Sequence, residues 1–331
     1  MEPTLFKSNN VHENIQRRNK MSTVTLSESD RMEMTVLVDN YIDMLLQQNT
    51  DVMRRPKIST SISPLAEHGL SCLIKVYADS EEHVMLMDTG FSQKCLFHNI
   101  EALEVDVGQV ECVFLSHGHL DHFGGLMDFL HQARKGIPVI LHPEAFLERR
   151  LNAPTSGIRD MPQLEEEALK QIGASLHKVR EATTWCSDLI LTLGEVERVT
   201  DFEKGFPWAE AKIHRKWIVD PFYDDQGLAV NIKGKGLVVL GGCSHAGIIN
   251  TIKYAQKVSG IEKVYAVLGG FHLTGPLFEP IIGATIEEMG KIGPDIVVPM
   301  HCTGWNAVNE FSRQMPDQFI LNSVGTTYIF Q

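Results

Sequence analysis

The sequence predicts an α/β fold in which strands deliver functional side chains from their C-terminal ends. Two observations lead to this prediction. Apolar runs typical of buried strands recur along the chain, and they are separated by turns or by stretches with helical spacing. Four of these runs end within a few residues of a histidine, and they lead to His117 with His119, to His245, to His272 and to His301. Ligands that arrive from strand ends far apart in the sequence are typical of αββα and α/β scaffolds.

The composition is that of a globular protein, since 43% of the 331 residues are hydrophobic and 22% are charged. The formal net charge of -12 argues against a general nucleic-acid binder, because such proteins usually carry a basic face. No apolar run approaches the length of a membrane span. We therefore expect a small-molecule substrate, with neither nucleic acid nor membrane as a partner. The sequence leaves open whether the chain forms a homo-oligomer.

The six cysteines form no C-x-x-C pair and no evenly spaced framework, and we interpret them as reduced thiols. This favours a cytoplasmic location. The cysteines are Cys72, Cys95, Cys112, Cys186, Cys243 and Cys302.

Residues 1–33 are predicted to form a disordered or loosely attached tail, and residues 34–331 a single domain. The tail is rich in Ser, Thr, Asn and Glu and lacks the apolar segment of a secretory signal. A transit peptide stays an alternative, although Glu2 and Glu13 count against it.

In the first half of the domain, strands are predicted at residues 34–38, 72–77, 84–87, 113–115 and 137–141, the second and third forming a hairpin. A helix is expected to start at Leu126. Residues 39–55 are either a short amphipathic helix or a flap, and we favour packing on the core over a substrate lid. Asp88 ends the third strand, where it either caps the following helix or orients a metal-bound histidine.

The second half of the domain contains two segments with a weak pattern. Residues 144–172 are predicted to be helical or irregular, as an insertion that covers one edge. Residues 204–219 carry three aromatic side chains among mixed charges, which indicates either a substrate-facing loop or a packed surface segment, and we favour the latter. Elsewhere, strands are predicted at 189–193, 227–232, 236–240, 264–268 and 294–299, and helices at 248–259 and 281–292.

The stretch from His117 to His122 concentrates three imidazoles and one carboxylate directly after a strand. These donors suit zinc, iron or manganese. His117 and His119 are separated by one residue, so both can point the same way from an extended chain and clamp one ion. The adjacent Asp121 and His122 can then serve a second ion or a bound water. A purely structural zinc site is the weaker interpretation, because such sites favour closed, cysteine-rich ligand sets.

This H-x-H-x-D-H motif resembles the signature of the metallo-β-lactamase superfamily. Within it, the chain resembles the group named after an archaeal enzyme of methanopterin biosynthesis, 7,8-dihydropterin-6-methyl-4-(β-D-ribofuranosyl)aminobenzene 5′-phosphate synthase. The resemblance covers residues 34–331 and implies an αββα sandwich with a two-metal site between the sheets. The segments that carry it are Glu67–Ser71, Leu115–His119, Gly242–Gly247, Gly269–Leu273 and Pro299–Gly304.

The resemblance also implies the site residues and two divalent ions, with zinc as the first choice and iron or manganese as alternatives. One ion would be held by His117, His119 and His245, and the other by Asp121, His122 and His301. Asp88 would orient a metal-bound histidine without binding a metal itself. Glu67 and His68 are candidates for the substrate pocket. His272 has no place in the general pattern, and it is either a substrate contact or a ligand.

One departure from the superfamily pattern concerns the bridging ligand. Many superfamily hydrolases have an Asp where a late strand ends in Gly-Asp, whereas here the strand ends in Gly242-Cys243-Ser244-His245. The two metals would then be unequally held, or one site would be empty, or His245 itself would fill the position.

Three functions remain. In the first, the chain is a metal-dependent hydrolase in which a metal-bound hydroxide attacks a small, anionic ester, phosphoester or lactone. Asp121 would orient the nucleophile and receive its proton, and His272 or His68 would stabilise the leaving group. In the second, the chain is a transferase of the synthase kind that displaces pyrophosphate. In the third, it is a ligand-binding protein without catalysis.

Overall fold

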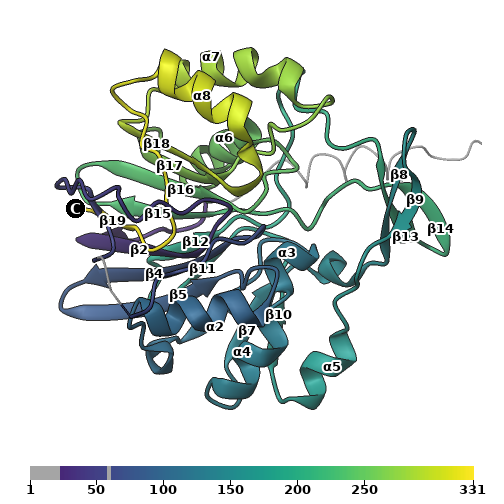
Figure 1. The fold of residues 1–331 in the computed structure, drawn as a ribbon, viewed down its shortest axis with the longest axis horizontal. Helices are drawn as coiled ribbons and strands as arrows, with labels where there is room; N and C mark the ends of the chain where they lie inside the picture. The colour runs from purple at the N-terminus through teal and green to yellow at the C-terminus, as the bar shows by residue number, and fades with distance from the viewer. Residues whose placement is uncertain (1–22, 58–60) are drawn as a thin grey trace, which may run out of the picture.

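The computed structural model describes residues 23–57 and 61–331. Two β-sheets lie face to face and helices cover their outer faces, which confirms the predicted αββα sandwich (Figure 1). One outer layer contains α6 (Ile248–Ser259), α7 (Ile282–Ile292) and α8 (Trp305–Gln314). The other contains α2 (Gln93–Ala102) and α4 (Leu126–Gln132), and the short helices α3 (Leu120–Phe123) and α5 (Glu166–Gln171) lie on the same side.

The sheet under α6, α7 and α8, called sheet A here, has the order β11–β12–β15–β16–β17–β18, with β1 paired to β15. Strands β16, β17 and β18 run parallel, so their C-terminal ends lie at the same end of the sheet. The strands of sheet A are β1 (Glu28–Ser29), β11 (Thr183–Trp185), β12 (Ile190–Thr192), β15 (Leu228–Ile232), β16 (Gly236–Gly241), β17 (Val264–Gly270) and β18 (Ile296–Met300).

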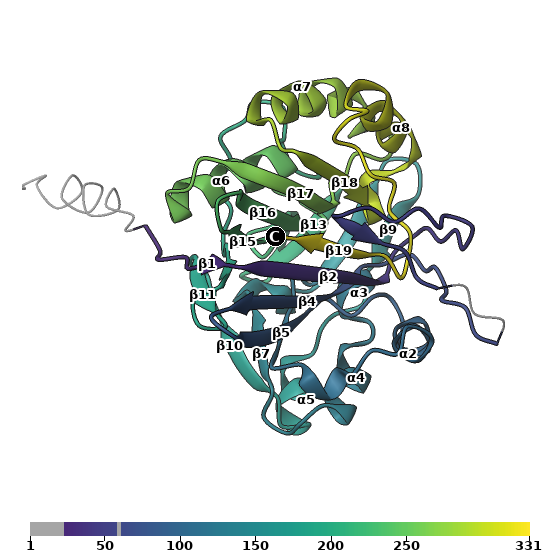
Figure 2. The same cartoon turned by 90° about the vertical axis from the view of Figure 1, so that its left-hand side faces the viewer.

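The opposite sheet, called sheet B here, has the order β10–β7–β6–β5–β4–β2–β19–β3. Its strands β5, β6 and β7 also run parallel. Figure 2 shows the C-terminal strand β19 beside β2, so segments from both ends of the described chain pair in one sheet. The strands of sheet B are β2 (Arg31–Val38), β3 (Met53–Arg54), β4 (Ser71–Ala78), β5 (Glu81–Met87), β6 (Cys112–Phe114), β7 (Pro138–Leu141), β10 (Ser175–Lys178) and β19 (Thr327–Phe330).

Local sequence explains the boundaries of two confirmed elements. The β4–β5 hairpin turns through Asp79 and Ser80, which both have positive φ (48° and 73°), as a tight hairpin turn requires. Helix α6 has the predicted bounds. The carboxylate of Glu203 accepts hydrogen bonds from two amides in the first turn of α6, and the helix ends at Gly260 in the left-handed conformation.

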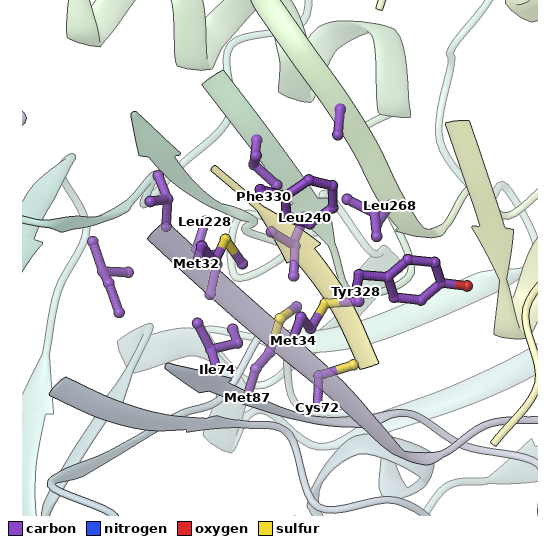
Figure 3. Close-up of a cluster of buried hydrophobic side chains, with 14 of the residues drawn as sticks. Met32, Met34, Cys72, Ile74, Met87, Leu228, Leu240, Leu268, Tyr328 and Phe330 are labelled. Carbon is purple, nitrogen blue, oxygen red and sulfur yellow. The ribbon is translucent and has the colours of Figure 1, made fainter. Parts of the chain in front are cut away.

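The hydrophobic core forms three layers, one between the sheets and one under each set of helices. Figure 3 shows the layer between the sheets, where alternate side chains of β2 and β19 meet residues of β15, β16 and β17. Met32, Met34, Tyr328 and Phe330 are fully buried there. Because alternate residues of a strand point to opposite faces, β2 also supplies Leu37 to the layer under α2 and α4.

Two weakly patterned segments form a third sheet that the sequence did not predict. Its order is β14–β13–β8–β9, and it projects from one end of the sandwich (Figure 1). The prediction of a helical or irregular insertion at 144–172 is therefore wrong at β8 and β9, whereas the rest of the segment, which includes α5, is helical or irregular as predicted. The strands are β8 (Arg149–Ala153), β9 (Gly157–Asp160), β13 (Ala209–Ile213) and β14 (Lys216–Val219).

The boundary of the predicted N-terminal tail lies too far along the chain. Residues 1–22 are outside the described residues, but residues 23–33 contact the domain. The Val24 amide donates to the Val258 carbonyl, β1 pairs with β15, and β2 begins at Arg31. Because the segment is polar, its composition did not predict these backbone hydrogen bonds.

Residues 39–55 form no helix, so the helical interpretation is wrong for this segment. Leu45 is 83% exposed there, which does not fit the core packing that we favoured. All six cysteines are free thiols. Among the described residues, no helix has both the length and the apolar character needed to cross a bilayer.

Candidate metal centre

Loops that follow five strands bring the predicted ligands together. Sheet B contributes the loops after β5 and β6, and sheet A contributes the loops after β16, β17 and β18. Within each sheet these strands run parallel, so their C-terminal ends open onto one crevice. The ligand atoms of Asp121, His122 and His301 lie within 4.8 Å of one another, as do those of His117 and His245.

The first group of ligands contains His117, His119 and His245. His119 Nδ1 and His245 Nε2 are 3.2 Å apart. Two nitrogens on one tetrahedral zinc, each with a bond of ~2.0–2.1 Å, would be about 3.3 Å apart. The His117 ring lies 4.6 Å from the His119 ring and 4.9 Å from the His245 ring. His117 Nε2 is buried and has no hydrogen-bond partner among the described residues, which suits a nitrogen that binds a metal.

The second group contains Asp121, His122 and His301. Asp121 Oδ2 lies 3.2 Å from His301 Nε2 and 3.9 Å from His122 Nε2. The shorter contact is not aligned as a hydrogen bond, and His301 Nε2 is otherwise unpartnered in the described part of the chain. Close approach without hydrogen-bond alignment is what two donors aimed at a shared ion would give.

Residues that hydrogen-bond to the ligand histidines determine which ring nitrogen faces the metal position. Asp88 Oδ2 accepts a hydrogen bond from His122 Nδ1 (2.7 Å) and another from the Ser116 hydroxyl (2.7 Å). That hydroxyl lies 3.0 Å from His117 Nδ1 and can accept a hydrogen bond from it. Since Nδ1 is the donor to these partners, Nε2 is the nitrogen of each ring that can bind a metal once it is deprotonated. The helix-capping interpretation of Asp88 is wrong, because Ser92 caps α2.

Asn40 performs the same task for His301, and the sequence analysis did not identify it. Asn40 Oδ1 lies 3.1 Å from His301 Nδ1, and Asn40 Nδ2 donates to the His301 carbonyl (3.0 Å). A lone Asn after a strand has no distinctive spacing, so only the folded structure reveals its role.

Cys243, which stands where the superfamily pattern has its bridging Asp, was not among the predicted ligands. Its Sγ lies within 4.8 Å of the ligand atoms of Asp121, His122 and His301, and also of those of His117 and His245. It lies 3.2 Å from His122 Nε2. Cys243 therefore occupies the space between the two groups, where superfamily members with a Gly-Asp strand end have a carboxylate. A third set of close donor atoms contains Cys243, His272 and Cys302.

Electrostatics make most of these donors ready to bind a cation. Burial lowers the pKa of His117, His119 and His245, that of His119 to about 3, so these rings are neutral. Burial also acts to lower the pKa of His122, but Asp88 and Asp121 outweigh it and raise the pKa to about 9. Burial acts to raise the pKa of Asp121, yet His122 and His301 outweigh it and keep the carboxylate ionised.

Backbone strain is concentrated in the same loops. Asp88, Ser244, His272 and His301 are non-glycine residues with φ between 46° and 57°. Each such backbone conformation raises the free energy of the folded state by about 1–3 kcal/mol, and it persists only where surrounding contacts hold it. The Ser244 hydroxyl, for example, donates to the Gly270 carbonyl (2.7 Å) and so ties the loop after β16 to the end of β17.

The turn at residues 220–226 joins the two halves of the centre. Asp224 accepts a hydrogen bond from the Gly118 amide (2.9 Å), and Asp225 accepts one from the Ala246 amide (2.9 Å). Arg149, at the start of β8, pairs with both Asp220 and Asp224 at 2.7 Å. A Cβ on Gly118 would lie 2.1 Å from the Ala145 carbonyl, so the motif packs closely against this region.

The residues predicted to contact substrate lie in different environments. His68 lies at the mouth of the site, with Nε2 3.4 Å from Asp121 Oδ2. His272 lies against His245, with a distance of 4.3 Å between the rings. Substrate contact by Glu67 stays a prediction. In the structure its carboxylate accepts hydrogen bonds from the Ser92 amide (2.8 Å) and hydroxyl (2.5 Å) and so holds the start of α2.

A cavity of about 620 Å³ opens directly onto both groups of ligands. Its wall includes Phe91, Phe206, Trp208 and Phe278, and no lysine or arginine of the described chain lines it. Phe206 and Trp208 therefore face the cavity, contrary to our preference for a packed surface segment at 204–219. That preference is correct only for Trp217, which packs under the Arg150 guanidinium (4.2 Å).

A second cavity of about 410 Å³ adjoins the first. His245, His272, Leu277 and Phe278 belong to the walls of both cavities, and Lys204 lies in the wall of the second. The two cavities therefore meet at His272.

Comparison with known proteins gives consistent matches. A sequence model of the metallo-beta-lactamase superfamily matches residues 69–170. The chain is 33% identical over 258 residues to the 7,8-dihydropterin-6-methyl-4-(beta-D-ribofuranosyl)-aminobenzene-5'-phosphate synthase of Methanocaldococcus jannaschii, a match that covers 77% of this chain and 87% of that protein. It is 31% identical over 260 residues to an uncharacterised protein of the same archaeon, covering 78% and 92% of the two chains. The crystal structure of Tm1679, a metal-dependent hydrolase of the beta-lactamase superfamily, matches with a TM-score of 0.68 and 26% identity, covering 89% and 98%.

Proposed function

The chain is an enzyme that belongs to the metallo-β-lactamase superfamily, and we propose that it uses two divalent ions, preferably zinc, to hydrolyse an ester, phosphoester or lactone. The observation that carries the proposal is the convergence of donors from separate strand ends, with His119 Nδ1 and His245 Nε2 only 3.2 Å apart. A site with open access to a cavity is typical of catalytic rather than structural metals. The alternative of a non-catalytic binding protein is set aside.

The donors divide between the two ions as the resemblance implies. His117, His119 and His245 would hold one ion, and Asp121, His122 and His301 the other. Cys243 would lie between the two, because its Sγ is close to both groups. Divalent ions held there supply Lewis acidity, which lowers the pKa of water and polarises the bond to be cleaved.

Asp121 and His68 are the groups best suited to handle protons. The Asp121 carboxylate lines the main cavity and is kept ionised, so it can orient water through a hydrogen bond. Burial lowers the pKa of His68, and its Nδ1 lies 3.2 Å from the amide nitrogen of Asn40. An accepted hydrogen bond at Nδ1 leaves the proton on Nε2, next to Asp121. His68 is also solvent-accessible, so it can pass protons between Asp121 and bulk water.

The cavity suggests which part of the substrate lies beside the metals. Its aromatic wall favours a planar or otherwise apolar group. An anionic group on the substrate would have to be paired by the metals, because no lysine or arginine of the described chain lines this cavity. His272 Nδ1 is buried and unpartnered among the described residues, which leaves it free to bind a leaving group.

A hydrolysis screen with metal removal tests the proposal. Aryl esters, lactones and phosphodiesters would be assayed with purified protein, with chelated protein, and after zinc is restored. We expect turnover to disappear on chelation and to return with zinc. The variant His301→Ala should lose at least ~100-fold in kcat/KM, as expected for a group needed in the transition state. The matched control His131→Ala alters an exposed histidine of α4 and should have little effect. Full activity in metal-free protein would rule the proposal out.

A transferase that displaces pyrophosphate is the second candidate. Two observations favour it, namely the 33% identity to the archaeal synthase and the pair of cavities that meet at His272, which suits an enzyme with two substrates. The discriminating assay offers a dihydropterin pyrophosphate donor with an arylamine acceptor. Pyrophosphate release that depends on the acceptor supports the transferase, whereas release in its absence supports hydrolysis.

A further inference from the structure

A second cluster of metal-binding side chains lies away from the catalytic crevice. It contains His83 near the start of β5, Glu111 just before β6, and Cys186 in the turn between β11 and β12. One donor atom from each of the three residues lies within 4.8 Å of the others. The catalytic ligands follow the C-terminal ends of β5 and β6, so this cluster lies at the opposite ends of the same two strands. His83 and Asp88 are five residues apart, which is about 16 Å along a strand.

We propose that His83, Glu111 and Cys186 bind a structural divalent ion, with zinc as the best fit. The set offers one imidazole, one carboxylate and one thiol, and this mixture of nitrogen, oxygen and sulfur suits zinc better than magnesium or calcium. His83 Nδ1 and Glu111 Oε2 already lie 2.9 Å apart. All three side chains are partly buried, so an ion can enter from solvent and still be shielded.

The neighbours of the cluster are arranged as the supports of a metal site usually are. The second ring nitrogen of His83, Nε2, lies 3.0 Å from the Ser187 hydroxyl, which would fix the orientation of the ring. The thiol of Cys186 raises the pKa of the buried Cys112 thiol beside it, so a second thiol lies next to the cluster.

The backbone that presents Cys186 is unusual. Three consecutive non-glycine residues, Cys186, Ser187 and Asp188, have left-handed φ values of 55°, 56° and 62°. A run of this kind is unfavourable unless other interactions hold it. The Asp188 carboxylate accepts a hydrogen bond from the Thr184 hydroxyl (2.5 Å), and the Asp188 carbonyl accepts one from the Ser27 amide (2.9 Å). The turn thus holds its shape and directs Cys186 toward His83.

The ion would connect the two halves of the sandwich. His83 lies in β5 and Glu111 directly precedes the neighbouring strand β6 of sheet B, whereas Cys186 belongs to the β11–β12 hairpin of sheet A. Such a link would restrain the ends of β5 and β6 that are remote from the catalytic centre. Its effect would be on stability rather than on the chemical step.

Zinc stoichiometry of the full chain tests this proposal. Protein freed of metal by a chelator would be titrated with zinc under reducing conditions, and bound zinc per chain would be measured. We expect Cys186→Ser to bind one equivalent less than the wild type and to show a smaller rise in Tm on zinc addition. His83→Gln should give the same loss, and it serves as a second variant if the first folds poorly. The controls Cys95→Ser and His131→Gln, which change the same residue types elsewhere, should bind as much zinc as the wild type.

Two outcomes would overturn the proposal. One is unchanged zinc stoichiometry in both Cys186→Ser and His83→Gln. The other is an intact mass under non-reducing conditions that reveals a Cys112–Cys186 disulfide, together with no zinc bound at this position in the reduced protein. Neither outcome depends on the catalytic centre, because no residue of that centre is altered.

Discussion

At the scale of single residues, Cys243 has the largest consequence for the chemistry of the centre. A thiolate is a softer ligand than a carboxylate and forms longer bonds to zinc, about 2.3 Å against about 2.0–2.2 Å. A centre with sulfur between its two ions would prefer zinc or iron over magnesium. Burial raises the pKa of the Cys243 thiol, so metal binding must displace its proton.

Cobalt substitution tests the role of Cys243 without relying on catalysis. The experiment uses the Cys186→Ser background, which removes the other thiol proposed as a ligand. We expect cobalt-loaded protein to display a thiolate charge-transfer band, and the additional change Cys243→Ser to abolish it and to weaken metal binding at least ~10-fold. Adding Cys95→Ser instead should leave the band intact. Persistence of the band in the Cys243→Ser protein would exclude a sulfur ligand at this position.

The sequence could identify the histidines and Asp121 because the H-x-H-x-D-H spacing has a chemical meaning. It could not identify Asn40, a single residue whose role appears only when distant loops meet, and it placed Cys243 at the position of the bridging Asp without assigning it as a ligand. Glu67 belongs to one of the segments that carry the family resemblance, and that resemblance did not reveal that its carboxylate is engaged by Ser92 at the start of α2.

At the scale of elements, the turn at residues 220–226 connects the two loops of the candidate metal centre. It links the His117–His122 loop to the His245 loop through Asp224 and Asp225, and Arg149 from β8 neutralises Asp220 and Asp224. Both carboxylates and the guanidinium are almost fully buried. Arg149, a residue of the projecting sheet, thus stabilises the turn that joins the two parts of the candidate metal centre.

Replacing Arg149 should therefore be costly. Arg149→Met leaves two buried carboxylates without a cation, and we expect a loss of about 3–5 kcal/mol in the free energy of unfolding. Urea denaturation monitored by circular dichroism measures this. Arg313→Met is the matched control, because Arg313 forms a solvent-exposed pair with Glu310 and its replacement should have a much smaller effect on the free energy of unfolding. Equal effects of the two substitutions would contradict the role given to this turn.

The strands of the projecting sheet escaped prediction for a physical reason. Strand β8 reads Arg-Arg-Leu-Asn-Ala and β13 reads Ala-Glu-Ala-Lys-Ile, so charged and small residues dilute the alternation expected of a strand. Pairing across Arg149–Ala211 and Arg150–Glu210 stabilises them, and these contacts are far apart in sequence. By contrast, β16, β17 and α6 were predicted well because strongly apolar runs specify them locally.

At the scale of the whole molecule, the individual strands were predictable because buried parallel strands read as continuous apolar runs, each ending at glycine or a polar loop. The sandwich itself was implied by the family resemblance of the H-x-H-x-D-H motif. The partition of strands between two sheets, and the return of β19 to pair with β2, depend on long-range packing that no local pattern encodes.

The metal-free protein should be most stable near pH 6.5. The pKa of His117, His119 and His245 is lowered in the folded state, so the unfolded chain binds more protons below pH 6.5 and stability falls as the pH drops. The pKa of His122 is raised to about 9, so the folded chain binds more protons between pH 6.5 and 9, and stability falls as the pH rises through that window. Melting temperatures of chelated protein from pH 5 to 9 measure both slopes.

Two controls accompany this profile. Asp88→Asn removes a main cause of the raised His122 pKa and should flatten the alkaline slope. Zinc should reverse that slope, because metal binding requires deprotonated ligands. A steady rise in the stability of chelated protein from pH 6.5 to 9 would contradict the assigned protonation states.

The most direct test of the central claim is X-ray diffraction from zinc-loaded crystals at the zinc absorption edge, which locates each ion. We predict two neighbouring anomalous peaks in the crevice, one among His117, His119 and His245 and the other among Asp121, His122 and His301, with Cys243 between them. The absence of anomalous density from both positions in zinc-loaded protein would contradict the account.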